Sequence, residues 1–400
     1  MKLMRTSTDR ILFTHVGSLP RPPALKKLLL ARQSGGAVEL QALRSEVVRA
    51  TKEAVERQIA AGVDVIGNGE LSRPGFQTYI PSRMRGFGGT SQRRTPRDLV
   101  EFPTLAAPAS EPSDNPPRRA IGVNPAAIAE VHYEDLRAAG EECEIFEEAA
   151  APHEGRYVER FMTAPSPGII ATTMLNQYYD SHEAYVDALA REMAKEYRLI
   201  AERGFVLQID APDLAMERTI MYQDEPLATF LLAAEHSVAA INRAIKGLPL
   251  DQVRLHCCYG NYEGPHIHDI ELHDILPILY QARVGALSLE LANPRHQHEY
   301  EVLRRNPPPD HMILMPGVID TTTNFVEHPQ VVANRILQAV DAVGDRERVI
   351  ASTDCGFGTF ASYELVHPAV VWPKLKAGAE GAQIASERLW GASRRPSRQS

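Results

Sequence analysis

Cysteine is scarce in this sequence of 400 residues, which contains only four, at positions 143, 257, 258 and 355. A secreted fold that depends on disulfides usually carries more cysteines, at regular spacings, in a much shorter chain. We therefore expect reduced thiols and a reducing compartment. Reduced thiols remain free to bind a metal ion.

Long apolar runs and an excess of basic residues are missing as well. No stretch approaches the ~20 apolar residues that a membrane-spanning helix needs, and the N-terminus, MKLMRTSTDRILFTHVGSLP, has too short an apolar run for a signal peptide. The formal net charge of -8 provides no basic field for nucleic acid phosphates. We expect a cytoplasmic protein whose partners include neither membranes nor nucleic acids.

The composition, with 44% hydrophobic and 24% charged residues, is that of an ordinary globular protein, and the length allows two domains or one large barrel. Short apolar runs alternate with segments of helical spacing. The runs predict strands over 11–16, 63–70, 168–175, 205–210, 253–261, 286–293, 312–320 and 349–356. The other segments predict helices over 23–32, 38–61, 182–203, 226–246, 272–283, 298–305, 326–343 and after His367.

Eight strands that are each followed by helix predict an α/β fold, a (β/α)8 TIM barrel formed by the whole chain, with a doubly wound open sheet as the alternative. The barrel is favoured because polar residues end so many strands. They are Glu70, Asp210, His256, Cys258, Glu290, Asp320, Asp354 and Cys355. In a barrel these strand ends form one rim, where barrel enzymes have their active sites.

Residues 72–165 interrupt the alternation between the second and third predicted strands with basic, Gly- and Pro-rich stretches and an acidic stretch around Cys143. Structureless connections of this length are uncommon in compact domains, so we expect an insertion with some strands and a helix over about 126–138. A lid over the site, a subunit contact in a homo-oligomer and a solvated decoration all remain open as roles. The tail, 392–400, is expected to be disordered.

The stretch VRLHCCYGN, residues 253–261, reads as a strand that ends in a metal site. Successive side chains on a strand point to opposite faces, so His256 and Cys258 project the same way and Cys257 points into the core. Zinc accepts nitrogen and sulfur ligands but needs three or four of them, and Glu290 and Cys355 end two later strands. The four residues together predict a zinc site, although each alone is more often structural.

Seven motifs follow one another along the chain: HVGSLPRP, GNGE, QIDAPDLAME, HCCYGNYEGPH, LSLELAN, MPGVID and STDCG. In this order they resemble the catalytic barrel of cobalamin-independent methionine synthase and its short single-barrel relatives. The resemblance implies the same zinc ligands. It also implies that Glu70 and Asp210 bind the amine of the substrate, and that the backbone of Gly17 and Ser18 meets its carboxylate.

The resemblance further implies a zinc-dependent S-alkyltransferase acting on a small-molecule thiol and an alkyl donor, most like homocysteine methylation in methionine biosynthesis. Zinc deprotonates a bound thiol, and the thiolate attacks the donor. Addition of a thiol to an epoxide, as in the related epoxyalkane:coenzyme M transferases, is an alternative. A zinc hydrolase is a second alternative, which two thiolate ligands disfavour because they make zinc a poorer Lewis acid.

The sequence departs from the family pattern on the donor side of the site. The catalytic His that follows the seventh strand in a Gly-Val-x-Asp-x-His setting is replaced by Thr322, and GIIATTMLNQYYD contains no counterpart of the folate-stacking tryptophan. A replacement proton donor is expected among His266, His268 and His15, with Asp320 as a further catalytic candidate. The sequence leaves the alkyl donor open.

Overall fold

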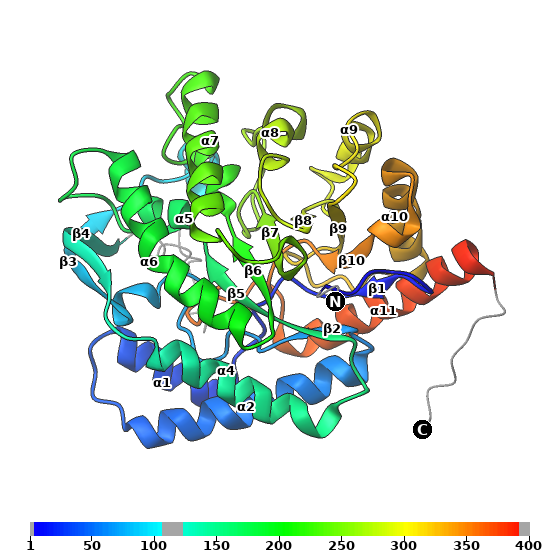
Figure 1. The fold of residues 1–400 in the computed structure, drawn as a ribbon, viewed down its shortest axis with the longest axis horizontal. Coiled ribbons are helices and arrows are strands. Elements are labelled where there is room, and N and C mark those ends of the chain that lie inside the picture. Colours follow the sequence, from blue (N-terminus) through cyan, green and yellow to red (C-terminus); the bar gives the residue numbers. More distant parts are fainter. Residues whose placement is uncertain (1–3, 106–122, 392–400) are drawn as a thin grey trace.

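An eight-stranded parallel sheet lies at the centre of the protein in the computed structural model, which describes residues 4–105 and 123–391 (Figure 1). The strand order is β1-β10-β9-β8-β7-β6-β5-β2. The strands are β1 (Leu12–Phe13), β2 (Val65–Gly67), β5 (Glu159–Pro165), β6 (Val206–Asp210), β7 (Val253–Cys257), β8 (Ala286–Leu289), β9 (Ile313–Ile319) and β10 (Ile350–Thr353). A parallel bridge between Thr14 and Val65 joins β1 to β2. The sheet is thereby closed, which confirms the predicted (β/α)8 barrel.

Helices surround the barrel and connect its successive strands (Figure 1). They are α1 (Pro23–Gln33), α2 (Leu40–Ala61), α4 (Arg137–Ala150), α5 (Pro167–Thr173), α6 (His182–Glu202), α7 (Leu227–Ala244), α8 (Leu272–Leu279), α9 (Tyr300–Arg305), α10 (Pro329–Val343) and α11 (Pro368–Trp390). The outer helices pack in sequence, with α2 on α4, α4 on α6 and α6 on α7, and α11 returns to pack on α2. Within 4–105 and 123–391, no helix combines the length and apolarity needed to cross a membrane.

The third barrel strand is β5, and the prediction of a strand over 168–175 was wrong. That run forms α5 instead, because Ser166 accepts a hydrogen bond from the backbone N–H of Ile169 and Pro167 occupies the first helical turn. Every residue of α5 is buried. A short run that is apolar on all sides reads equally well as a buried strand or a buried helix, since it has no periodicity to separate them.

The insertion contains an antiparallel hairpin of β3 (Met84–Gln92) and β4 (Val123–Tyr133) and the short helix α3 (Arg97–Glu101). The predicted helix over 126–138 was wrong: β4 takes most of these residues, because pairing with β3 and burial of Ala126 and Ala127 outweigh the helix propensity of alanine. At the end of 72–165, α4 and β5 belong to the barrel itself. The part outside the barrel is therefore shorter than predicted. The tail 392–400 lies outside the described residues.

A buried ionic network ties the start of the insertion to the barrel helices. Glu142 on α4 pairs with Arg73 at 2.8 Å and with Arg83 at 2.9 Å. Arg83 also reaches Glu196 on α6 at 3.1 Å, and the hydroxyl of Tyr79 donates to the same carboxylate at 2.6 Å. Each buried charge thus has both an opposite charge and hydrogen bonds, which is the condition under which burial is tolerated.

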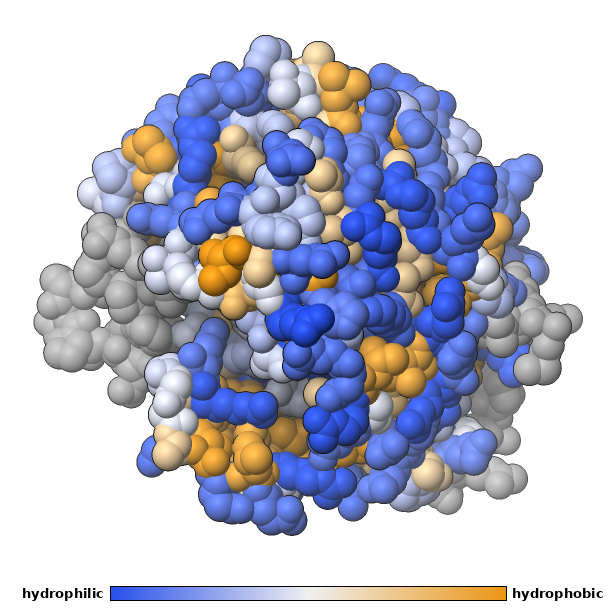
Figure 2. Space-filling model, turned by 60° about the vertical axis from the view of Figure 1, so that its left-hand side comes forward, coloured by the Kyte–Doolittle hydropathy of each residue, from blue (hydrophilic) through white to orange (hydrophobic). Residues whose placement is uncertain are grey.

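The face in Figure 2 carries mainly hydrophilic side chains, with hydrophobic ones in small separate patches. This pattern is usual for the surface of a globular protein, in which single exposed apolar side chains are common. The view therefore gives no sign of a broad apolar band.

Substitution of two helical glycines by alanine should change the stability of the protein in opposite directions. A Cβ on Gly378 of α11 would lie 2.2 Å from Cζ of the buried Phe13, whereas one on Gly140 of α4 would meet nothing nearer than Arg203 at 3.9 Å. We expect Gly378→Ala to lower the free energy of unfolding by about 1–3 kcal/mol through overpacking. Gly140→Ala should raise it by about 0.5–1 kcal/mol through helix propensity. Urea denaturation of both variants checks the sign, and equal effects would contradict the packing of α11 on β1.

Candidate active site

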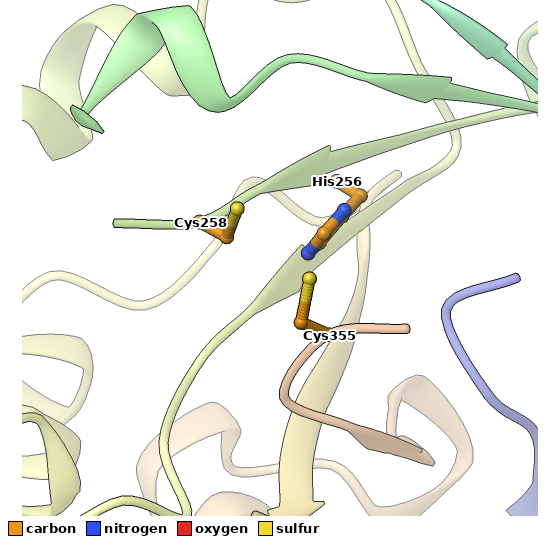
Figure 3. Close-up of side chains that lie close together, drawn as sticks. All are labelled: His256, Cys258 and Cys355. Atoms are coloured by element: carbon orange, nitrogen blue, oxygen red, sulfur yellow. The ribbon is translucent and has the colours of Figure 1, made fainter. Parts of the chain in front are cut away.

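His256, Cys258 and Cys355 converge at the mouth of the barrel. His256 lies in β7, Cys258 follows that strand, and Cys355 follows β10. One ligand atom from each residue lies within 4.8 Å of the other two, and Figure 3 shows the three side chains pointing toward one another. Cys257 points the other way and is buried in the hydrophobic core, as the alternation of the strand predicted.

The imidazole of His256 is held by a carboxylate from the neighbouring strand. Asp210 and His256 are register partners in β6 and β7, and Asp210 Oδ1 lies 3.1 Å from His256 Nδ1. This contact leaves Nε2 on the side of the two thiols, 3.3 Å from the carbonyl oxygen of Asp354. A carboxylate on the outer nitrogen is the usual way to orient a metal-binding histidine. Asp210 therefore has a role that the sequence reasoning did not assign to it.

The donor set fits zinc. One imidazole and two thiols supply three of the four ligands of a tetrahedral zinc site. The hydrogen bond with Cys355, together with burial, raises the pKa of the Cys258 thiol well above its usual range. A bound cation would supply the positive charge that thiolates need at this point.

Glu290, the predicted fourth ligand, is not part of this three-residue group. It follows β8, is buried, and accepts a hydrogen bond from the side chain of Asn293 at 3.2 Å. Burial and the nearby Cys258 raise its pKa well above the usual range. Asp354 fixes the turn after Glu290, because its carboxylate accepts 2.9 Å hydrogen bonds from three successive backbone N–H groups, those of residues 291–293.

A cavity of about 670 Å³ opens above these residues. Its lining includes the predicted metal and substrate residues Ser18, Glu70, Asp210, His256, Cys258 and Cys355. Residues that are distant in the sequence thus face one space, as the barrel prediction required. The size is within the range of small-molecule sites, which hold roughly 300–1,000 Å³.

Glu70 presents an unpaired carboxylate oxygen. Its Oε1 accepts a hydrogen bond from Thr163 at 2.8 Å, while its buried Oε2 has no hydrogen-bond partner among the described residues. Burial raises the pKa of Glu70 to about 7, with Asp210 adding to the effect against the opposing charge of Arg73. An ammonium group would satisfy Oε2 and favour the ionised carboxylate.

Gly17 makes room for this carboxylate. A Cβ on Gly17 would lie 2.8 Å from Glu70 Oε1 and 2.6 Å from Thr163 Cγ2, so a larger residue would displace Glu70. Gly17 itself does not line the cavity, whereas Ser18 does. The hydroxyl of Ser18 accepts a hydrogen bond at 3.3 Å from the backbone N–H of Gly358, in the turn after Cys355.

Two candidate proton donors lie away from the cavity. His15 is buried beneath it, with Nε2 2.8 Å from Gln58 Oε1, and burial lowers its pKa to about 4. His266 has both ring nitrogens engaged, by Asp269 at 2.8 Å and by the carbonyl oxygen of Tyr262 at 3.0 Å. Replacement of the family's catalytic histidine by one of them stays a prediction, and at these positions neither side chain lines the cavity.

Asp320 is likewise occupied by its own loop. Its carboxylate accepts hydrogen bonds from the backbone and hydroxyl groups of Thr322 and Thr323, at 2.5–3.1 Å. It does not line the cavity, so its position indicates a role in shaping the turn after β9 rather than in proton transfer. Thr322, at the family's histidine position, belongs to the same turn.

Residues 123–370 match the family model described as the cobalamin-independent synthase catalytic domain. This match covers more than half of the chain. The chain belongs to this family.

The relatives of this chain match it to different extents. A methionine synthase of Thermococcus kodakarensis is 25% identical over 384 residues, covering 94% of this chain and 93% of its own. A 2-hydroxypropyl-CoM lyase of Xanthobacter autotrophicus is 27% identical over 178 residues, 38% of this chain and 46% of its own. Among solved structures, this chain is similar to a B12-independent methionine synthase from Shewanella sp. W3-18-1 in complex with selenomethionine. The two superpose with a TM-score of 0.71 at 20% identity, over 95% of this chain and 99% of the other. This similarity supports the fold.

One wall of the cavity comes from the insertion, for which a lid was one of the roles left open by the sequence, although none of the residues of this wall was named. Part of the insertion lines it, including Gln92, Arg93, Arg94, Thr95, Pro96, Leu99, Val100 and Pro103. These residues precede the segment that matches the family model. The only sequence signal was their position, in an insertion that follows a rim strand, since residues that follow rim strands are placed over the site of a barrel.

Asp210→Asn should weaken metal binding without removing a metal ligand. The neutral amide oxygen accepts the Nδ1–H of His256 more weakly than the charged carboxylate does, so the imidazole is less firmly oriented and a weaker metal ligand. We expect metal affinity to fall about 10- to 100-fold, as is usual for the loss of such a partner. Competition with a chelator, in the absence of substrate, measures the metal affinity of the variant and of the wild type. Asp224→Asn, at a carboxylate with 72% of its side chain exposed, is the control, and equal affinity in both variants would contradict the orienting role.

Proposed function

We propose that this protein is a zinc-dependent S-alkyltransferase that acts on a small thiol, most like a homocysteine S-methyltransferase. The observation that carries the proposal is the convergence of His256, Cys258 and Cys355 in the cavity that also contains Glu70 and Asp210. Membership of the cobalamin-independent synthase family and the similarity to archaeal methionine synthases support the same reaction class.

His256, Cys258 and Cys355 would hold the zinc ion, with Glu290 as the candidate for the fourth position. Bound zinc would lower the pKa of the substrate thiol and keep its sulfur as a thiolate. Asp210 keeps the imidazole of His256 in place. Glu70 binds the substrate ammonium with its unpaired Oε2, and the turn at Gly17 and Ser18 lies where backbone groups would meet the substrate carboxylate.

The alkyl donor would occupy the upper part of the cavity. There the insertion and the loops after β6 and β10 contribute the apolar side chains of Phe76, Leu99, Met216, Ile220 and Phe360, beside polar ones such as Arg93 and Arg94. This lining excludes water from the reacting atoms while the sulfur–carbon bond forms and the leaving group departs. It also favours a lid as the role of the insertion.

Addition of a thiol to an epoxide is the second candidate. The similarity to a 2-hydroxypropyl-CoM lyase, over less than half of either chain, favours it. Glu70 and Asp210 favour the first candidate, because a sulfonate thiol has no ammonium group to pair with two carboxylates. Thiol-dependent proton release and product analysis, with homocysteine and coenzyme M as thiols and methyl donors and epoxides as electrophiles, separate the two candidates.

Removal of the metal should abolish turnover. We expect the chelator-treated protein and the Cys258→Ser variant to fall to the background rate, because the thiol then stays protonated near neutral pH. Added Zn²⁺ should restore the chelated wild type but not the variant. Cys257→Ala is the matched control, since its side chain points into the core. Full activity of a zinc-free protein would refute the proposal.

Glu70→Gln should weaken binding of an amino-acid thiol selectively. Because a charged hydrogen bond is lost, we expect the KM for homocysteine to rise roughly 10- to 100-fold. The KM for 4-mercaptobutanoate, which lacks the amine, should not change. Glu301→Gln, an exposed carboxylate with 59% of its side chain accessible, serves as the control. A parallel loss for both thiols would show that Glu70 does not bind the amine.

The contact between the Glu70 carboxylate and the substrate ammonium should depend on pH. With its pKa raised to about 7, Glu70 is increasingly protonated as the pH falls from 8 to 6, so the affinity for homocysteine should decrease over this window. The Glu70→Gln variant should show a weaker dependence, because only the proton released by the zinc-bound thiol then remains. Homocysteine titrations of both proteins at pH 6, 7 and 8 measure the difference.

A further inference from the structure

A second group of metal-binding side chains lies outside the cavity. His266, Asp269 and His296 each offer one ligand atom within 4.8 Å of the other two. Asp269 Oδ2 is 2.8 Å from His266 Nδ1 and 3.0 Å from His296 Nε2. Asp269 and His296 are almost fully buried, while the His266 side chain keeps 13% of its surface accessible.

The outer nitrogen of each histidine is anchored by an acceptor. His266 Nε2 lies 3.0 Å from the carbonyl oxygen of Tyr262, and His296 Nδ1 lies 3.2 Å from Glu299 Oε2. Such partners on the far side of the ring fix the tautomer of a metal-binding histidine and direct its lone pair inward. His266 also has a φ of 53°, so a left-handed backbone directs its ring toward Asp269.

A count of protons shows that this group needs two positive charges, either as extra protons on the two histidines or as one divalent ion. All four ring nitrogens face acceptors, namely one carbonyl oxygen and the carboxylates of Asp269 and Glu299. A neutral imidazole has only one N–H to donate. Hydrogen bonds alone therefore need two doubly protonated histidines in a largely buried group. A divalent ion would replace the two inner protons and balance the same two carboxylates.

We propose that His266, Asp269 and His296 form a second metal site, for a divalent transition ion such as Zn²⁺. Two imidazoles and one carboxylate are a common ligand set for such ions, with the remaining positions open to water. This site is independent of the proposed catalytic function, because it shares no ligand with His256, Cys258 and Cys355.

A metal ion at this site would stabilise the conformation of the loop after β7. The ring of His296 stacks on Tyr259 with centroids 3.7 Å apart, and Tyr259 is the residue after Cys258. Tyr262, whose carbonyl oxygen anchors His266, lines the cavity and donates a hydrogen bond to Asp98 of α3 at 2.9 Å. An ion at this point would hold the loop between the catalytic cavity and the insertion.

Metal stoichiometry tests the proposal. We expect about two metal ions per chain in the Zn²⁺-loaded wild-type protein after dialysis, by mass spectrometry of the metal, because each site has at least three ligands. Cys258→Ser and His296→Gln should each retain about one. His273→Gln, at a histidine with 61% of its side chain exposed, is the control and should match the wild type.

Cobalt distinguishes the two sites. Co²⁺ bound to thiolates gives intense near-ultraviolet charge-transfer absorption, whereas a site of nitrogen and oxygen ligands does not. In the wild type this absorption should saturate after one equivalent while binding continues to a second. His296→Gln and Asp269→Asn should lose only the second equivalent. Binding of a single equivalent by the wild type would overturn the proposal whether or not the variants fold, and would indicate two protonated histidines instead. Absence of the charge-transfer signal would count against the catalytic site alone.

Discussion

Closure of the barrel between β1 and β2 is the constraint on which the candidate site depends. The backbone N–H of Asp64 donates to the carbonyl oxygen of Phe13 at 2.9 Å, and the Thr14 hydroxyl donates to that of Val65 at 2.8 Å, beside the bridge that completes the sheet. In an open sheet, the ends of β7 and β10 would be spread along one edge. In the closed sheet they face a common space, and Cys355 reaches the ligand atoms of His256 and Cys258.

Within that space, buried carboxylates create a need for positive charge. Glu70, Asp210, Glu290 and Asp354 are all buried around the mouth of the barrel. Burial raises the pKa of Glu70 and of Asp354 to about 7, which reflects the cost of several negative charges in a poorly solvated site. A metal cation and a substrate ammonium are the charges that would relieve this cost. The same accumulation of buried negative charge therefore suits the site to the proposed zinc ion and substrate ammonium.

The loop after β7 connects the candidate metal ligands to the insertion. It begins at Cys258, supplies Tyr262 to the cavity wall, and continues to His266 and Asp269 in the second group of potential ligands. The His268 side chain pairs with Glu101 of α3, so the insertion is tied to this loop at more than one point. Direct contacts thus link the insertion to the residues next to His256 and Cys258.

The sequence by itself determined the features that depend on a few neighbouring residues. The two-residue period of a strand placed His256 and Cys258 on one face and Cys257 on the other, and alternating strands and helices indicated the barrel. The sequence was ambiguous where one local pattern fits both a strand and a helix. Residues 168–175 are such a case, because they form α5 rather than the predicted strand. Only the tertiary structure decided that Glu70 is open to the cavity while His15, His266 and Asp320 are not, and that residues 92–103 form a wall. The reason is physical: hydrophobic periodicity and turn chemistry act within one element, whereas the partners of a buried polar group are brought together by strands that are far apart in the chain.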